Sequence, residues 1–273
     1  ATLFDSEGNE RVVAKLGNAF VRDLAKTYTH RVLEFGLVNL KSPSVPGNNF
    51  DLVNLFDSPG SDTFVSEGSQ SEITGPSYRI TTEGYDRNVA RSILGGDDIA
   101  VLNGTLAGGE NFTARVTGDP KKNFGSLRSA NNAAVKFRHR AIGFSHVIAN
   151  SIGGHDKAYL FGGQGFDSYL GAASIGEMEG QGYRFTANHF NRINVNAGGN
   201  KDEAVLIDGA GDDRLVATQN VAKMLGAAES FTHRATGFAK VIANASEGGF
   251  DVLDVASDLA FSLFEDGEWE LKK

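Results

Sequence analysis

One phrase recurs five times along the chain: an aspartate, then apolar residues at alternate positions, then a turn. A pair of glycines stands one or two residues before four of the five copies. The repeat length is about 47 residues. Tandem repetition of this kind predicts one continuous repeat fold rather than two unrelated domains. The five phrases begin at Asp51, Asp98, Asp156, Asp202 and Asp251.

A second segment recurs upstream of each phrase, and its aromatic or histidine lead residue marks the same place in every repeat. Each repeat contains short runs in which every second residue is apolar, separated by Gly, Asn, Asp and Ser, which is typical of strands and turns. No amphipathic stretch of helical period interrupts them. The lead residues are His30, Tyr78, Phe137, Tyr183 and Phe231.

The pattern predicts an all-β fold, a right-handed parallel β-helix of five repeats. We expect two three-stranded coils in each repeat and so about ten coils in total. Residues 1–273 would form a single solenoid domain, and residues 118–132 would be an inserted loop that bulges from one edge. A five-bladed β-propeller is the alternative, because four-stranded blades repeat at a similar length.

The composition limits the classes of partner. The chain has no cysteine, and its net charge of −8 argues against nucleic acid, which selects a broadly basic surface. No apolar run is long enough to span a membrane, and no signal segment precedes Leu3, so we expect a mature or excised module. No cofactor is required by any motif in the sequence.

Arginines recur in phase with the repeats. In the segment from Phe137 to Ala141, alternation sends Phe137, His139 and Ala141 inward and leaves Arg138 and Arg140 facing outward. Alignment of the repeats predicts columns of arginine along one flat face, which could bind carboxylates or sugar hydroxyls. The alternative is that these arginines pair with acidic neighbours and cover the strands with their stems. The predicted ligand-binding arginines are Arg79, Arg138, Arg140, Arg184 and Arg234.

Two aromatic residues are candidates for stacking on sugar rings. Tyr159 should point outward because Ala158 and Leu160 point inward, and Trp269 lies near the carboxyl terminus. Most phenylalanines fall on inward positions and are assigned to the core. The histidines His30, His139 and His233 also fall in inward columns, and no pair of carboxylates, Ser-His-Asp set or phosphate loop stands out. We therefore expect a non-enzymatic protein, with a polysaccharide lyase or glycoside hydrolase as the second hypothesis.

Residues 162–170 read Gly-Gly-Gln-Gly-Phe-Asp-Ser-Tyr-Leu, which resembles the nonapeptide of calcium-binding β-rolls. The resemblance implies a structural calcium ion held by turn aspartates. The alternative is that these aspartates cap turns by accepting backbone N–H bonds. The predicted metal ligands are Asp156, Asp167, Asp202, Asp208 and Asp213.

The repeat phrases as a whole resemble modules of very large secreted proteins of planctomycetes and verrucomicrobial-type bacteria. Their architecture is also similar to that of parallel β-helix carbohydrate-binding modules. These resemblances imply a secreted module that is linked to catalytic or other extracellular modules and binds a plant or microbial polysaccharide, of xylan type or containing uronates. A structural or adhesive extracellular repeat is a third hypothesis, because fold analogy does not establish a ligand.

Overall fold

The structure is a computed structural model that describes residues 1–6, 8–25, 27–43, 51–131, 133, 136–199 and 201–271. Strands predominate, and the described residues contain no α-helix, only two 3₁₀ turns at Pro120–Lys122 and Ala227–Glu229. The chain divides into two compact units. Unit 1 comprises Ala1–Asn111 and Asp119–Gly154, and unit 2 comprises Phe112–Gly118 and His155–Lys273.

Unit 1 is built from two sheets, here named sheet 1A and sheet 1B. Sheet 1A has the strand order β1 (Thr2–Phe4), β5 (Leu37–Lys41), β9 (Tyr78–Glu83), β8 (Gln70–Gly75), β7 (Thr63–Glu67), β11 (Ile99–Asn103) and β15 (His146–Asn150). Sheet 1B has the order β13 (Phe124–Arg128), β14 (Arg138–Ile142), β10 (Arg87–Arg91), β6 (Leu52–Phe56), β2 (Glu10–Lys15), β3 (Asn18–Asp23) and β4 (Thr29–Val32).

Unit 2 also has two sheets, named sheet 2A and sheet 2B. Sheet 2A has the order β19 (Tyr183–Asn188), β18 (Ile175–Gly180), β17 (Asp167–Ala172), β21 (Glu203–Ile207), β25 (Lys240–Ala245) and β27 (Ser262–Gly267). Sheet 2B has the order β28 (Glu270–Leu271), β26 (Val252–Val255), β22 (Arg214–Thr218), β23 (Val221–Leu225), β24 (Thr232–Thr236), β20 (Arg192–Asn196), β16 (Lys157–Phe161) and β12 (Asn111–Arg115).

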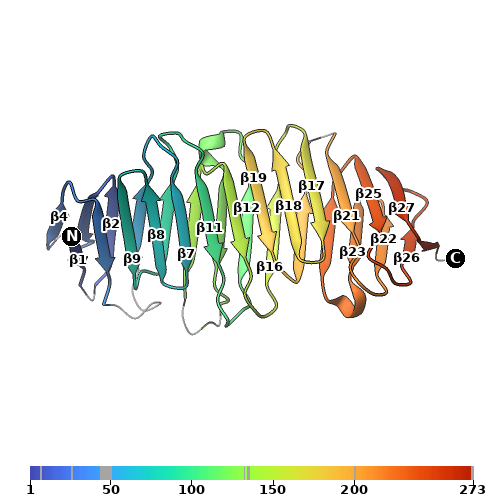
Figure 1. Cartoon of the computed structure of the whole chain (residues 1–273), viewed down its shortest axis with the longest axis horizontal. Helices are drawn as coiled ribbons and strands as arrows, with labels where there is room; N and C mark the ends of the chain where they lie inside the picture. The colour runs from blue at the N-terminus through green and yellow to red at the C-terminus, as the bar shows by residue number, and fades with distance from the viewer. Residues whose placement is uncertain are drawn as a thin grey trace. The chain divides into compact units, whose positions relative to one another are not determined.

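Within each unit the chain crosses from one sheet to the other and returns to lie parallel to an earlier strand. In unit 1, for example, β10 lies between β6 and β14 and is parallel to both. At intervals the chain stays in one sheet and forms an antiparallel meander of three strands, as β17, β18 and β19 do in unit 2 (Figure 1). The predicted all-β solenoid with parallel strands is confirmed, and its sheets are mixed.

The predicted three-stranded coil is wrong. The described residues of each unit form two sheets rather than three, because runs assigned to a third side of the coil fold back as hairpins. The turn between β2 and β3 shows why: Leu16 and Gly17 have φ values of 49° and 74°, as in the type I′ turns that join hairpin strands through two residues. Ten three-stranded coils are therefore excluded, and four-stranded blades around a channel are likewise absent from the described residues.

Part of the segment predicted as an inserted loop at residues 118–132 is a strand. Phe124–Arg128 form β13, which pairs antiparallel with β14 in sheet 1B. The 3₁₀ turn at Pro120–Lys122 precedes this strand, and Asn132 lies outside the described residues. The prediction of a single domain over residues 1–273 stays a prediction.

The predicted inward positions are confirmed with one exception. Phe137, His139, Ala141, Tyr183, Phe185 and Ala187 are all at least 95% buried. His30, in contrast, is exposed on β4, because β4 is the edge strand of sheet 1B and has a neighbour on one side only.

The recurring aspartates join each coil to the preceding one. Asp51 accepts a hydrogen bond from the backbone N–H of Glu10 at 3.0 Å, and Asp98 accepts one from Asp62 at 2.7 Å. In unit 2, Asp202 and Asp251 accept equivalent bonds, both of 2.9 Å, from the N–H groups of Asp167 and Asp213. All four acceptors are buried, so the phrase that dominates the sequence is a structural ladder of side-chain-to-backbone hydrogen bonds.

Candidate ligand-binding face

The five predicted arginines do not share one face. In unit 1, Arg79 lies on β9 in sheet 1A, whereas Arg138 and Arg140 lie on β14 in sheet 1B. In unit 2, Arg184 lies in sheet 2A and Arg234 in sheet 2B. The predicted continuous column is wrong, because an odd number of crossings separates equivalent segments. Between β4 and β9 the chain crosses three times, which moves the next copy to the other sheet.

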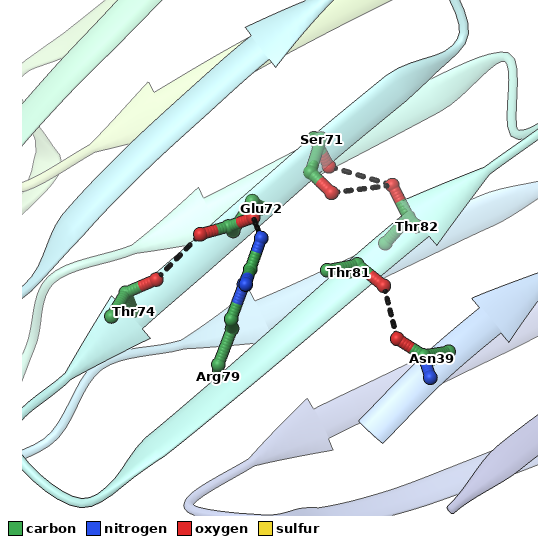
Figure 2. Close-up of polar contacts among 7 residues, drawn as sticks. All are labelled: Asn39, Ser71, Glu72, Thr74, Arg79, Thr81 and Thr82. Carbon is green, nitrogen blue, oxygen red and sulfur yellow. Dashed lines mark hydrogen bonds and ion pairs between the residues drawn. The ribbon is translucent and has the colours of Figure 1, made fainter. Parts of the chain in front are cut away.

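The arginines of sheets 1A and 2A are held by glutamates on the adjacent antiparallel strand. The Arg79 guanidinium donates to Glu72 at 2.6 Å, as Figure 2 shows, and Arg184 donates to Glu179 at 2.9 Å. The two lysines on the strands of these sheets also form ion pairs, Lys41 with Glu83 and Lys240 with Glu203. For Arg79 and Arg184 the ion-pair interpretation therefore describes the structure.

A shallow depression of about 500 Å³ lies over β7, β8 and β9 of sheet 1A. Its polar residues are engaged with one another: Glu72 accepts hydrogen bonds from Arg79 and Thr74, and Thr81 donates to Asn39 at 2.8 Å (Figure 2). The ion pair with Glu72 thus already neutralises the charge that Arg79 would offer to a ligand carboxylate.

Sheet 1B has the opposite electrostatic character. Its strands contain acidic residues at two places only: Glu10, which is buried, and Asp23, whose carboxylate accepts the Ala25 N–H at 2.9 Å. The outward positions contain no carboxylate and many cations. The nine basic residues on these strands are Arg11, Lys15, Arg22, Arg31, Arg87, Arg91, Arg128, Arg138 and Arg140.

The register places several of these cations directly beside one another. Arg138 on β14 is aligned with Arg128 on β13 and with Arg87 on β10, which makes a row of three arginines at the inter-strand spacing of about 4.8 Å. Like charges placed opposite each other destabilise a sheet. Among the described residues, neither Arg128 nor Arg138 forms an ion pair that would compensate this cost.

Arg140 lies one position further along the same face. Its guanidinium stacks on the ring of Phe124 at 4.1 Å from the centroid. Burial, together with the positive charges of Arg138 and Arg91, lowers the pKa of Arg140. Three arginine side chains, Arg91, Arg138 and Arg140, therefore lie close enough to influence one another.

A second depression, of about 510 Å³, lies on sheet 1B. It combines the basic side chains of Lys15 and Arg31 with the acidic Glu34, which follows β4, and with apolar surface from Phe20, which is 38% exposed. A cation beside an exposed aromatic ring suits a charged sugar. The cation can bind the carboxylate of the sugar, and the aromatic ring can pack against its apolar face.

Sheet 2B is also basic, although less exclusively. Its strands carry two acidic residues, and one of these, Asp254, forms an ion pair with Arg214. Arg115 stacks over Phe161 at 4.1 Å from the ring centroid. The six basic residues of these strands are Arg115, Lys157, Arg192, Arg214, Lys223 and Arg234.

Of the two aromatic residues predicted to stack on sugar rings, only one lies on a sheet face. Tyr159 lies on β16 of sheet 2B and points outward between buried Ala158 and Leu160, as predicted. Trp269 is half-buried between β27 and β28, and its indole N–H donates to the Asp266 carbonyl at 3.2 Å. Tyr159 therefore shares a sheet with the cations of unit 2, whereas Trp269 lies on no sheet face.

Four of the predicted calcium ligands accept hydrogen bonds from the backbone. Asp167 accepts the Gly163 N–H at 2.7 Å and the Tyr183 hydroxyl at 2.6 Å, and Asp202 accepts the Gly199 N–H at 2.8 Å. Asp208 and Asp213 accept further backbone N–H bonds. Turn capping thus accounts for these four side chains, whose predicted calcium site remains untested.

Only two of the five predicted ligands belong to a compact acidic group. Asp208 and Asp213 come together with Asp251 so that ligand oxygens lie within 4.8 Å of one another. Asp156, Asp167 and Asp202 do not join such a group of three within the described residues.

Sequence reasoning missed the arginines of sheet 1B that lie outside the aromatic-led segments, above all Arg11, Arg22 and Arg128. The available signal was the absence of acidic residues at outward positions of these strands, not the phase of the repeat. No helix of the described residues is long and apolar enough to cross a membrane. Comparison of the chain with family models, curated proteins and solved structures finds no match.

Proposed function

We propose that the protein is a non-catalytic binding module for an acidic polysaccharide, which lies along the outward face of sheet 1B. One observation carries the proposal: nine basic residues cover the strands of this sheet with no carboxylate at an outward position, in a chain whose net charge is −8. A concentration of one charge against the overall charge selects a ligand of the opposite charge.

The chemistry fits a uronate-containing glycan such as a glucuronate-decorated xylan. Arginine forks bind carboxylates in bidentate fashion and also donate to hydroxyls. A polymer repeats the same modest contact on successive strands and gains affinity from its length. Phe20 and Phe124 supply apolar surface beside Arg31 and Arg140 for the faces of sugar rings.

The proposal extends to the setting of the module. We infer a secreted protein, built from five repeats as a right-handed solenoid, joined to other extracellular modules and using a polysaccharide as its partner. Sheet 2B, with Tyr159 and Arg234, provides a second and weaker surface of the same kind. Asp208 and Asp213 lie beside Asp251, and the backbone hydrogen bonds that these side chains accept favour turn capping at this part of the predicted calcium site.

Binding is expected to depend on sheet 1B and not on sheet 1A. Replacing Arg138 and Arg140 together by alanine should weaken binding to an acidic xylan by about 1 to 3 kcal/mol, roughly 5- to 150-fold, because charged hydrogen bonds are lost. The matched control is Arg79→Ala, which removes an arginine of the same unit that is already paired with Glu72. Affinity electrophoresis in gels containing acidic or neutral xylan measures the effect.

The same gels, together with an assay for released sugars, distinguish the binding module from an enzyme and from a structural repeat. Raising the salt concentration should weaken retardation, since screening acts on exposed charges. Equal retardation by neutral and acidic xylan, or an equal loss in Arg79→Ala, would contradict the assignment to sheet 1B. Steady release of sugar products would favour the lyase or hydrolase, and an absence of retardation by every glycan would favour the structural spacer.

A further inference from the structure

Three carboxylates meet in unit 1 at a place that the calcium-roll resemblance does not identify. Asp5 follows β1, Glu10 begins β2 and Asp51 precedes β6, and their ligand oxygens lie within 4.8 Å of one another. Asp5 is 9% exposed, Glu10 is fully buried and Asp51 is 1% exposed. These three residues are here called the amino-terminal acidic cluster. Three buried like charges are unfavourable unless something compensates them.

Hydrogen bonds from the described residues satisfy only some of the carboxylate oxygens of the cluster. Asp51 accepts hydrogen bonds from the Glu10 N–H and the Ser42 hydroxyl, both at 3.0 Å, and one Glu10 oxygen accepts the Tyr28 hydroxyl at 2.8 Å. Both Asp5 oxygens and the Oε2 atom of Glu10 are buried without a hydrogen-bond partner. No lysine, arginine or histidine of the described residues forms an ion pair with any of the three.

A fourth polar side chain independently indicates a ligand at this place. Tyr85 is fully buried, and its hydroxyl has no hydrogen-bond partner among the described residues. Tyr85 lies beside Asp5, but no contact of its hydroxyl meets the geometry of a hydrogen bond. Burial is the first cause that raises the pKa of Tyr85, and the neighbouring Asp5, Asp51 and Glu10 follow. A buried hydroxyl that forms no hydrogen bond is costly, and a ligand at this position would satisfy it.

The acidic group in unit 2 provides an internal comparison. Asp208 accepts hydrogen bonds from the N–H groups of Ser246 and Glu247, Asp213 accepts one from Ala227, and Asp251 accepts one from Asp213. No oxygen of that group is buried without a partner. The unsatisfied oxygens are therefore a property of the amino-terminal cluster and not of every set of three aspartates in this fold.

We propose that Asp5, Glu10 and Asp51, together with the Tyr85 hydroxyl, bind a calcium ion. Calcium is held by six to eight oxygen ligands at 2.3–2.6 Å in flexible geometry, and the ligand oxygens of the cluster all lie within 4.8 Å of one another. Magnesium, with bonds of 2.0–2.1 Å, demands near-octahedral geometry and prefers to keep its waters. The site does not depend on the proposed glycan function.

Thermal unfolding of the full chain tests the site. Chelator-treated protein should gain about 5 °C or more in Tm when free calcium is 100-fold above its Kd, because the ion binds only the folded state. The gain should be much smaller with magnesium. Glu10→Gln should abolish the gain, whereas the control Asp208→Asn should retain it. Each gain is measured within one variant, so a lower starting Tm does not affect the comparison.

Terbium luminescence covers the case in which Glu10→Gln does not fold. Terbium replaces calcium and is excited through nearby tyrosines such as Tyr85, so the wild-type signal should be displaced by calcium and lost in Asp5→Asn. An absence of any Tm gain in the wild type would overturn the proposal and leave protonation as the compensation. An undiminished gain in folded Glu10→Gln, or displaceable luminescence retained in Asp5→Asn, would overturn it as well.

Discussion

Replacing Gly96 by alanine is expected to lower the free energy of unfolding by about 3 to 5 kcal/mol, the sum of backbone strain and a steric clash. Gly96 has a φ of +110°, a conformation that side chains rarely adopt. A Cβ atom at this position would lie 2.3 Å from the carbonyl oxygen of Gly60 and 3.0 Å from the Ser61 nitrogen. Both are backbone atoms of the preceding turn, so the clash cannot be relieved by rotating a side chain.

The neighbouring glycine is the matched control. Gly95 has a similar φ of +97°, but a Cβ there would meet nothing within 4 Å. Gly95→Ala should therefore cost only the conformational strain, about 1 to 3 kcal/mol. Urea denaturation of both variants at the same pH measures the difference. Equal losses in the free energy of unfolding would show that the stacked turns can move apart to accept a Cβ atom. The close approach would then not explain the glycine at position 96.

This contact explains why glycines come in pairs before the repeated aspartates. The second glycine of each pair lies against the backbone of an earlier turn: Gly154 against Gly108, Gly199 against Gly165, and Gly249 against Gly211. The sequence displays the pairs clearly, yet it does not reveal their cause. The cause is a distance between turns that are tens of residues apart, and no local pattern reports such a distance.

Features that depend on local alternation could be predicted from the sequence. The burial of Phe137, His139 and Phe185 follows from a two-residue period along one strand, whichever strand lies alongside. The cross-section of the coil could not be predicted in this way. Whether a run such as Asn18–Asp23 begins a third sheet or returns as a hairpin depends on the turn at Leu16 and Gly17, and the leucine gave no sign of a positive φ.

The same topological ambiguity divided the predicted binding site. Alignment placed Arg79 and Arg138 in one column, because equivalent residues of a simple coil stack on each other. With three crossings in each repeat, these residues belong to different sheets of unit 1, and only Arg138 lies in a row of three arginines. The sequence thus indicated arginine as the residue type and one strand of the face proposed as the binding site, whereas the choice between the two sheets required the strand order.

Two buried histidines are expected to make the protein sensitive to acid. His139 donates its Nε2–H to the Gly68 carbonyl at 2.8 Å, and His233 donates to Ala172 at 2.8 Å. Burial lowers the pKa of each to about 4, whereas a histidine in the unfolded chain titrates near 6.5. Between these values the unfolded chain binds more protons, so stability falls as the pH falls from 6.5 towards 4, by about 2 kcal/mol per histidine between pH 7 and pH 5.

The double variant His139→Phe and His233→Phe should therefore lose about 4 kcal/mol less stability than the wild type between pH 7 and pH 5, as measured by urea denaturation at each pH. Phenylalanine is the matched replacement because Phe185 fills the equivalent position in another repeat. The raised pKa values of Asp5 and Asp51 act in the opposite direction, but both proteins share them, so they cancel in the comparison. The wild type and the variant would lose stability in parallel only if both imidazoles could become charged inside the fold, which would require water to enter the core of each unit.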